Sequence, residues 1–227
     1  MSRPPAETGT NGEVGAFLRQ ARNLRRFTQG RARLIFAIDA TASRQPTWDL
    51  ACELQADMFT QSADVGALAV QLAYYRGIGE LHFSDWETDT RTLATRMSRV
   101  HCAAGRTQIA RLLAAVLKRR DDARALVFIG DAVEENTARL EELAGECRLR
   151  SLPLFVFQEG RDPQVRAAFE AMARISGGAF SEFDHSSARR LRELLGAVAR
   201  YAAGGRAALE NQTNPGARLL LRQLPKQ

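Results

Sequence analysis

Short runs of apolar residues alternate with segments of helical periodicity along most of this chain. The runs are typical of buried strands, and the segments between them repeat apolar side chains three and four positions apart, as an amphipathic helix does. Strands that alternate with helices predict a mostly parallel sheet, because parallel strands need crossover connections that cover both faces. We therefore expect a doubly wound α/β fold, with a central sheet of about six strands flanked by helices.

The chain contains six segments that favour strands: 34–38, 67–75, 80–84, 124–130, 152–157 and 179–183. Leu34–Ile38 and the run at 126–129 are apolar on both faces, which predicts central positions in the sheet. The segment 80–84 follows its predecessor after a turn at Gly77 and Gly79, so it is the candidate for an antiparallel strand. Helices are expected between the strands, at 46–58, 88–100, 109–117, 140–147, 165–176 and 191–198.

The ends of the chain differ in character from this alternating region. Residues 1–12 are rich in Pro, Gly, Thr and Asn and predict a disordered lead-in. Residues 13–203 form the expected single domain, which includes an N-terminal helix at 13–27. Residues 204–227 are expected to form a C-terminal tail. A group of leucines in that tail could form a helix face that docks a partner without metal, namely Leu219, Leu220, Leu221 and Leu224.

The chain is basic, with a formal net charge of +6 over 227 residues. Lys occurs only at Lys118 and Lys226, so nearly all the cations are Arg. These Arg residues are spread over many helical segments and form no single stripe, which favours a solvated surface. A basic surface that binds nucleic acid is an alternative. We expect no specific nucleic-acid complex.

Cysteine use and hydropathy bear on the cellular compartment. The three cysteines are Cys52, Cys102 and Cys147, which are odd in number and contain no C-x-x-C pair. We therefore expect no disulfides and no zinc site. The first residues lack an apolar signal segment, and no stretch approaches 18 apolar residues, so we expect no membrane span. These features together predict a cytoplasmic protein.

Three polar clusters lie next to the predicted strands and helices. Asp39, Thr41 and Ser43 follow the first strand, Asp131 follows the run at 126–129, and Thr107 precedes the helix at 109–117. The carboxyl ends of parallel strands lie on one rim of the sheet, where open α/β sheets bind ligands. Carboxylates and hydroxyls are hard oxygen donors, which suit Mg2+, or Mn2+ or Ca2+. The clusters therefore predict a metal site with these five residues as ligands.

Each of these residues also has a purely structural interpretation. Thr107 could cap the helix that follows it, because Thr is common at helix N-termini. Asp131 could likewise cap the helix that carries Leu140, and Asp39 could stabilise a turn. The metal hypothesis therefore depends on all five residues meeting at one rim.

With these residues, the chain resembles the von Willebrand factor type A (VWA) domain family over roughly residues 31–203, a span set by the strand and helix patterns. The metal-ion-dependent adhesion site (MIDAS) of that family has an Asp-x-Ser-x-Ser loop, a Thr on a second loop and an Asp on a third. Asp39 and Ser43 match the first loop, Thr107 the second and Asp131 the third. Thr41 stands where the family usually has Ser, which keeps the hydroxyl. The segment ARISGGAF is similar to the family's stretch before its last strand.

The resemblance implies a Rossmann-like fold and a cytosolic, bacterial-type interaction module. In the family the protein leaves one metal position open, and a carboxylate from a partner protein often fills it. It therefore implies a protein partner with an acidic residue, and no catalysis. Arg44 and Arg106 lie in the surrounding loops and could steer such a partner.

An enzyme is the main alternative. Asp39 after a strand and Asp131 after Gly130 faintly resemble a Mg-dependent phosphatase of the haloacid dehalogenase type. Such an enzyme needs a general acid two residues after the nucleophile, where this chain has Thr41, which cannot donate its proton near neutral pH. The case for this phosphohydrolase is therefore weak.

Two further acidic groups have open interpretations. Glu134 and Glu135 could complement a helix N-terminus or tune the metal from the second shell. The segment HFSDWETDT offers four further metal-ligand types, which could bind a second ion but are more typical of a solvated turn that opens a helix: His82, Asp85, Glu87 and Asp89.

Overall fold

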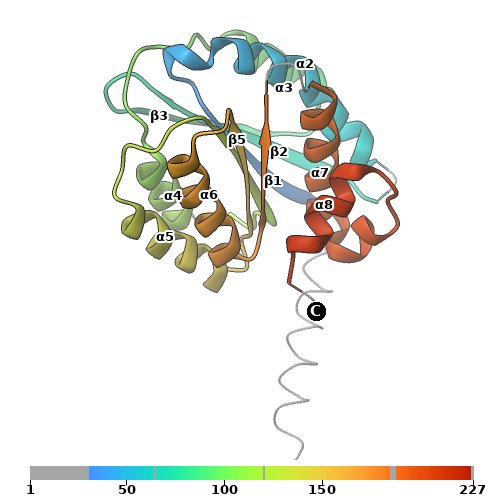
Figure 1. Cartoon of the computed structure of the whole chain (residues 1–227). Coiled ribbons are helices and arrows are strands. Elements are labelled where there is room, and N and C mark those ends of the chain that lie inside the picture. Colours follow the sequence, from blue (N-terminus) through green and yellow to red (C-terminus); the bar gives the residue numbers. More distant parts are fainter. Residues whose placement is uncertain (1–30, 64, 120, 185–187, 226–227) are drawn as a thin grey trace, which may run out of the picture. The chain divides into compact units, whose positions relative to one another are not determined.

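The computed structural model describes residues 31–63, 65–119, 121–184 and 188–225. Within them, six strands form one sheet in the order β3-β2-β1-β4-β5-β6 (Figure 1). The strands are β1 (Ala32–Asp39), β2 (Leu68–Arg76), β3 (Glu80–Glu87), β4 (Ala125–Gly130), β5 (Leu154–Glu159) and β6 (Ala179–Phe183). Of these six described strands, β3 alone is antiparallel to its neighbour. The expected doubly wound α/β fold is thus confirmed.

The strand β1 lies at the centre of the sheet, between β2 and β4. Its side chains are buried on both faces apart from Arg33, as its apolar run predicts. The parallel register pairs Asp39 with Tyr75 of β2 and Ile38 with Ile129 of β4. The carboxyl ends of these three strands therefore lie side by side.

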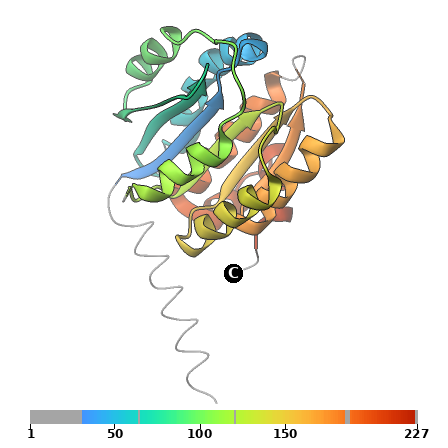
Figure 2. The ribbon, with the colours of Figure 1, turned by 90° about the vertical axis from the view of Figure 1, so that its left-hand side faces the viewer.

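Helices cover both faces of the sheet, and successive residues of each strand supply the two cores alternately. One core lies under α2 (Gln45–Ser62), α3 (Thr90–Ser98), α7 (Ala188–Glu210) and α8 (Pro215–Gln223). The other lies under α4 (Ile109–Lys118), α5 (Thr137–Leu149) and α6 (Pro163–Ser176). Figure 2 shows this second layer in front of the sheet.

Residues 204–224 continue the helical layer on the first face. The helix α7 runs through Gly204, and Gly205 adopts a positive φ of 70° before the chain continues to Glu210. In α8 and just after it, Leu220 and Leu224 are buried in the same core as the side chains of β1. A docking face that includes these two leucines is therefore not available to a partner. The expected lead-in at 1–12 and helix at 13–27 lie outside the described residues.

Local signals account for several element ends. Asp162 caps α6 by accepting hydrogen bonds from the N–H groups of Gln164 and Val165, and Pro163 takes the first helical position. Gly177 ends α6 in the left-handed conformation, with φ of 79°. Across the described ranges, we find no helix with the length and apolarity needed to cross a membrane.

Candidate metal site

The candidate ligands lie at the rim formed by the carboxyl ends of β1 and β4, which are neighbours in the sheet. Asp39 is the last residue of β1, and Asp131 directly follows Gly130 at the end of β4. Thr107 lies two residues before α4 begins. The β1–β4 pairing therefore brings the first and third polar clusters to neighbouring positions, as expected for parallel strands.

The Asp39 side chain, at the end of β1, is fully buried. Its Oδ1 accepts a hydrogen bond from the Thr41 N–H at 2.8 Å, and its Oδ2 accepts one from the Tyr75 hydroxyl at 3.1 Å. The first bond is the turn that was one structural interpretation of Asp39. The Thr41 hydroxyl also hydrogen-bonds to the Asp39 carboxylate, which places this oxygen beside that group.

The first and third loops meet through Ser43 and Asp131. The Ser43 hydroxyl donates a hydrogen bond to Asp131 Oδ2 at 3.3 Å, across a separation of 88 residues in the chain. Ser43 is exposed and the Asp131 side chain is 29% exposed. Solvent can therefore reach both groups, in contrast to the buried Asp39.

Thr107 is tied to the loop that carries Asp131. Its hydroxyl donates a hydrogen bond to the Glu135 carboxylate and accepts one from the Glu134 N–H at 3.0 Å. Its own N–H donates to the Glu134 carboxylate at 2.8 Å. The hydroxyl oxygen has two lone pairs, of which the Glu134 N–H uses one, so a second could serve a metal.

The helix-cap interpretations of Thr107 and Asp131 do not match the structure. Gln108 is the N-cap of α4, and Asn136 is the N-cap of α5, where its side chain accepts from two N–H groups. Glu135 instead serves the first turn of α4, because it accepts a hydrogen bond from the Ala110 N–H at 3.2 Å.

Arg44 is the residue whose placement differs most from expectation. It was expected to steer a partner from an exposed loop, but its side chain is only 1% exposed. The guanidinium forms an ion pair with Glu159 at the end of β5, and its Nε lies 3.8 Å from Asp131 Oδ1. The Thr47 hydroxyl also donates a hydrogen bond to the Glu159 carboxylate. The positive charge of Arg44 is therefore buried and cannot steer a partner from the surface.

The charges at the rim interact with one another. Burial raises the pKa of Asp39, the Thr41 hydrogen bonds lower it, and the negative charge of Asp131 raises it further. Burial lowers the pKa of Arg44, and the nearby Asp131 and Asp39 raise it. The two carboxylates are thus close enough to repel each other, and Arg44 offsets only part of that repulsion.

The acidic segment around β3 has a structural role in this fold. Asp89 is the N-cap of α3 and accepts hydrogen bonds from the N–H and hydroxyl of Thr92. Asp85 and Glu87 of β3 form ion pairs with Arg96 of α3. Among the described residues, no three His, Cys, Asp or Glu side chains gather in a metal-binding arrangement.

Comparison with solved structures finds the same architecture in other proteins. The SpRpn10 VWA domain aligns with 71% of this chain and 95% of its own, at 11% identity and a TM-score of 0.56. PTMP1 from the mussel byssus, in a form with a zinc-occupied MIDAS motif, aligns with 75% of this chain at 14% identity and a TM-score of 0.60. This chain covers 46% of the mussel chain, which is about half its length.

The chain has the VWA fold. No family model matches the sequence, and no curated protein matches it. The likeness is therefore one of architecture, and the VWA fold explains why the loops after β1 and β4 meet where they do.

The side chains at the rim of this VWA fold suit a hard divalent ion. Asp39 and Asp131 supply negative charge, and hydroxyls come from Thr41, Ser43 and Thr107. Such an all-oxygen set is the chemistry that Mg2+, Mn2+ and Ca2+ prefer. A cation held there would also relieve the repulsion between the two carboxylates.

Sequence reasoning missed two residues that shape this rim. Tyr75 reaches Asp39 because the β1–β2 register places them opposite each other. Glu159 reaches Arg44 as the last residue of β5, a fully buried strand. A carboxylate at the end of an apolar run was the signal that could have identified Glu159, since the same pattern identified Asp39 and Asp131.

Proposed function

We propose that this protein is a divalent-metal-dependent protein-interaction module. Asp39, Thr41, Ser43, Thr107 and Asp131 hold the ion, and a carboxylate of a protein partner completes its coordination. The observation that carries this proposal is the hydrogen bond from Ser43 to Asp131. It joins the loops after β1 and β4 through an exposed serine that lies four residues after the buried Asp39. The zinc-occupied MIDAS of the mussel protein supports it by analogy of fold.

The ion supplies a positive charge with an open position toward an incoming anion. Two carboxylates and three hydroxyls leave the site with little excess negative charge, so it stays attractive to another oxygen anion. Mg2+ is the proposed ion, with Mn2+ or Ca2+ as substitutes. The residues of this chain orient the donors: Tyr75 and the Thr41 N–H fix Asp39, and Glu135 fixes Thr107.

We propose no catalytic reaction at this rim. A phosphatase would need Asp39 to attack substrate, but both of its oxygens accept hydrogen bonds within the chain and the side chain is fully buried. Purified protein with Mg2+ should therefore show no turnover on a broad panel of phosphate esters. Reproducible turnover that disappears in Asp39→Asn would favour the enzyme.

The partner is proposed to be an acidic protein in the cytoplasm. Specific nucleic-acid binding is not proposed, since many Arg side chains form ion pairs with carboxylates on their own helix, as Arg166 does with Glu170 and Arg206 with Glu210.

Two experiments test the proposal. Isothermal titration calorimetry of the metal-stripped protein should detect Mg2+ or Mn2+ binding that Asp39→Ala and Asp131→Ala abolish. A pull-down with and without EDTA should capture a protein only when metal and Asp39 are both present. Absence of divalent binding at millimolar concentration would overturn the metal site. Capture that EDTA and Asp39→Ala leave unchanged would overturn recognition through the metal.

A further inference from the structure

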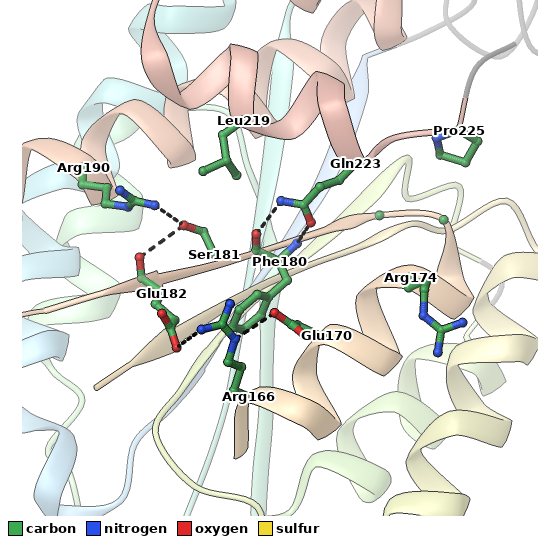
Figure 3. A pocket seen from close by; sticks show the side chains of 12 residues that line it. Arg166, Glu170, Arg174, Phe180, Ser181, Glu182, Arg190, Leu219, Gln223 and Pro225 are labelled. Carbon is green, nitrogen blue, oxygen red and sulfur yellow. Dashed lines mark hydrogen bonds and ion pairs between the residues drawn. The ribbon is translucent and has the colours of Figure 1, made fainter. Parts of the chain in front are cut away.

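A second surface lies away from the metal rim, along the open edge of the sheet. The strand β6 is the last strand of the sheet, so one side of its backbone has no neighbouring strand. A cavity of about 510 Å³ lies along this strand, between α6 and α8 (Figure 3). Exposed strand edges present peptide groups that can pair with another extended chain.

Gln223 occupies part of this edge as a strand would. Its side-chain Nε2 donates to the Phe180 carbonyl at 2.8 Å, and its Oε1 accepts from the Phe180 N–H at 2.8 Å (Figure 3). One amide therefore makes the pair of hydrogen bonds that an added strand makes with an edge residue. Glu182 is two residues further along β6, so its peptide groups face the same side as those of Phe180. Its carbonyl accepts a hydrogen bond from the Ser181 hydroxyl at 3.2 Å in the free protein (Figure 3).

The charges of the cavity are unevenly compensated. Arg166 pairs with Glu170 at 2.9 Å and with Glu182 at 3.5 Å, which accounts for both carboxylates. Arg190 donates only to the neutral Ser181 hydroxyl, at 3.1 Å. Within the described part of the chain, Arg174 forms no ion pair or hydrogen bond. Among the residues that the structure describes, these two cations have no carboxylate partner.

These two cations lie at opposite ends of the cavity (Figure 3). Arg190 contacts Ser181 of β6, and Arg174 lies near Gly177, which precedes the strand. Four residues of extended chain span roughly 13 Å. In an extended peptide, side chains four residues apart lie on the same face and are separated by a similar distance. Two cations along one strand edge are therefore complementary to an extended ligand with two acidic side chains on one face.

We propose that the β6 edge binds an extended, acidic peptide segment of a partner protein by strand addition. Main-chain hydrogen bonds to the open side of β6 supply the affinity, and Arg174 and Arg190 select two carboxylates on one face of the peptide. The Gln223 amide covers Phe180 in the free protein and is displaced by the peptide. This site uses no residue of the metal rim, so peptide binding at β6 can be tested separately from the function proposed above.

The probe is the synthetic peptide acetyl-EVTVE-amide, titrated into the 15N-labelled full chain in EDTA. The backbone amide chemical shifts of the protein should change around β6, from Gly178 to Glu182. The affinity for the peptide should fall in 0.5 M salt. The variants Arg174→Glu and Arg190→Glu should each weaken binding several-fold. Arg222→Glu is the matched control, because it makes the same charge change on an exposed part of α8 outside the cavity. Asp39→Ala should bind the peptide as the wild type does.

A further variant tests main-chain pairing. Gln223→Ala removes the competing amide, so the peptide should bind roughly 3-fold tighter, the effect expected from about one net hydrogen bond. Unchanged or weaker binding by a folded Gln223→Ala protein would overturn strand addition. The proposal also fails if acetyl-KVTVK-amide gives the same shifts, or if inorganic phosphate or a single-stranded oligonucleotide reproduces them. It fails equally if the shifts follow protein concentration without peptide, because the occupant is then a second copy of the chain.

Discussion

The buried guanidinium of Arg44 forms an ion pair with Glu159, which ends β5, and also contacts Asp131, which follows β4. Arg44 itself follows β1, so one side chain connects the ends of three neighbouring strands. Buried ion pairs contribute little net stability when compared with apolar residues, but removing one partner leaves an uncompensated charge.

The first prediction concerns this ion pair. Glu159→Leu should destabilise the protein by about 3–5 kcal/mol, because it leaves Arg44 buried without its closest carboxylate. The double variant Arg44→Met with Glu159→Leu should recover most of that loss. Urea unfolding in EDTA measures both. A double variant that is as unstable as the single one would show that the pair is not the cause.

The second prediction concerns the metal. Mg2+ at about 100 times its dissociation constant should stabilise the folded protein by about 2.7 kcal/mol. For a chain of this size that corresponds to a rise in Tm of about 5–10 °C. Asp131→Ala should lose the rise, whereas Asp184→Ala, outside the candidate ligand set, should keep it. Differential scanning calorimetry with and without Mg2+ provides the measurement.

The third prediction concerns pH in the absence of metal. Burial raises the folded-state pKa of Asp39 from its ordinary value of 3.8, so folding favours the protonated form. The stabilising contribution of this group is therefore full below the unfolded pKa and is lost as pH rises through the raised folded pKa. In EDTA at pH 7, Asp39→Asn should be more stable than the wild type. Below pH 3.8 this advantage should disappear.

With saturating Mg2+ at pH 7 the order should reverse, because only the wild type gains metal binding. Urea unfolding at the two pH values and in both metal conditions tests this. An Asp39→Asn protein that is less stable than the wild type in EDTA would contradict the pKa argument, whatever the metal does.

The fourth prediction concerns Glu135, which accepts a hydrogen bond from the Thr107 hydroxyl. A hydrogen bond of this kind orients the ligand oxygen and increases its basicity toward a metal. Glu135→Gln should weaken Mg2+ affinity by about 10-fold, the lower end of the range for such supporting residues. Glu141→Gln, an exposed change on α5, is the control and should bind normally. Titration calorimetry of both folded variants distinguishes them.

The fifth prediction concerns the loop that carries Thr107. A Cβ on Gly105 would lie 2.2 Å from the Gly77 carbonyl oxygen, so Gly105→Ala must displace one of two backbone segments. We expect a loss of about 1–3 kcal/mol, typical of overpacking, together with weaker Mg2+ binding. Gly66→Ala meets nothing within 4 Å and should be neutral in both assays. Equal behaviour of the two variants would refute this interpretation.

The sequence predicted the sheet well because its strands are apolar on both faces. All six predicted strand segments overlap the observed ones, and 179–183 coincides with β6. The boundaries differ where pairing overrides local pattern. For example, β3 continues to Glu87, because Trp86 and Glu87 pair with Gln71 and Val70 of β2.

The rim was only partly predictable. Parallel topology predicted that Asp39 and Asp131 would be neighbours, since both follow buried strands. The burial of Arg44 was not predictable, because its neighbours Ser43 and Gln45 are polar and a charged side chain between them is usually solvated. Only the register of β5 brings Glu159 within reach of it. The metal ligation by the five residues stays a prediction.

The central position of β1 has a consequence for folding. Ser43 and Asp131, which are 88 residues apart, meet only after β1 and β4 pair, a long-range contact that carries the entropic cost of closing a large loop. A chain that has formed only its local helices and the β2–β3 hairpin has no ion site. A divalent ion would therefore bind only molecules that have completed this long-range pairing, and would lower the population of partly folded, aggregation-prone chains.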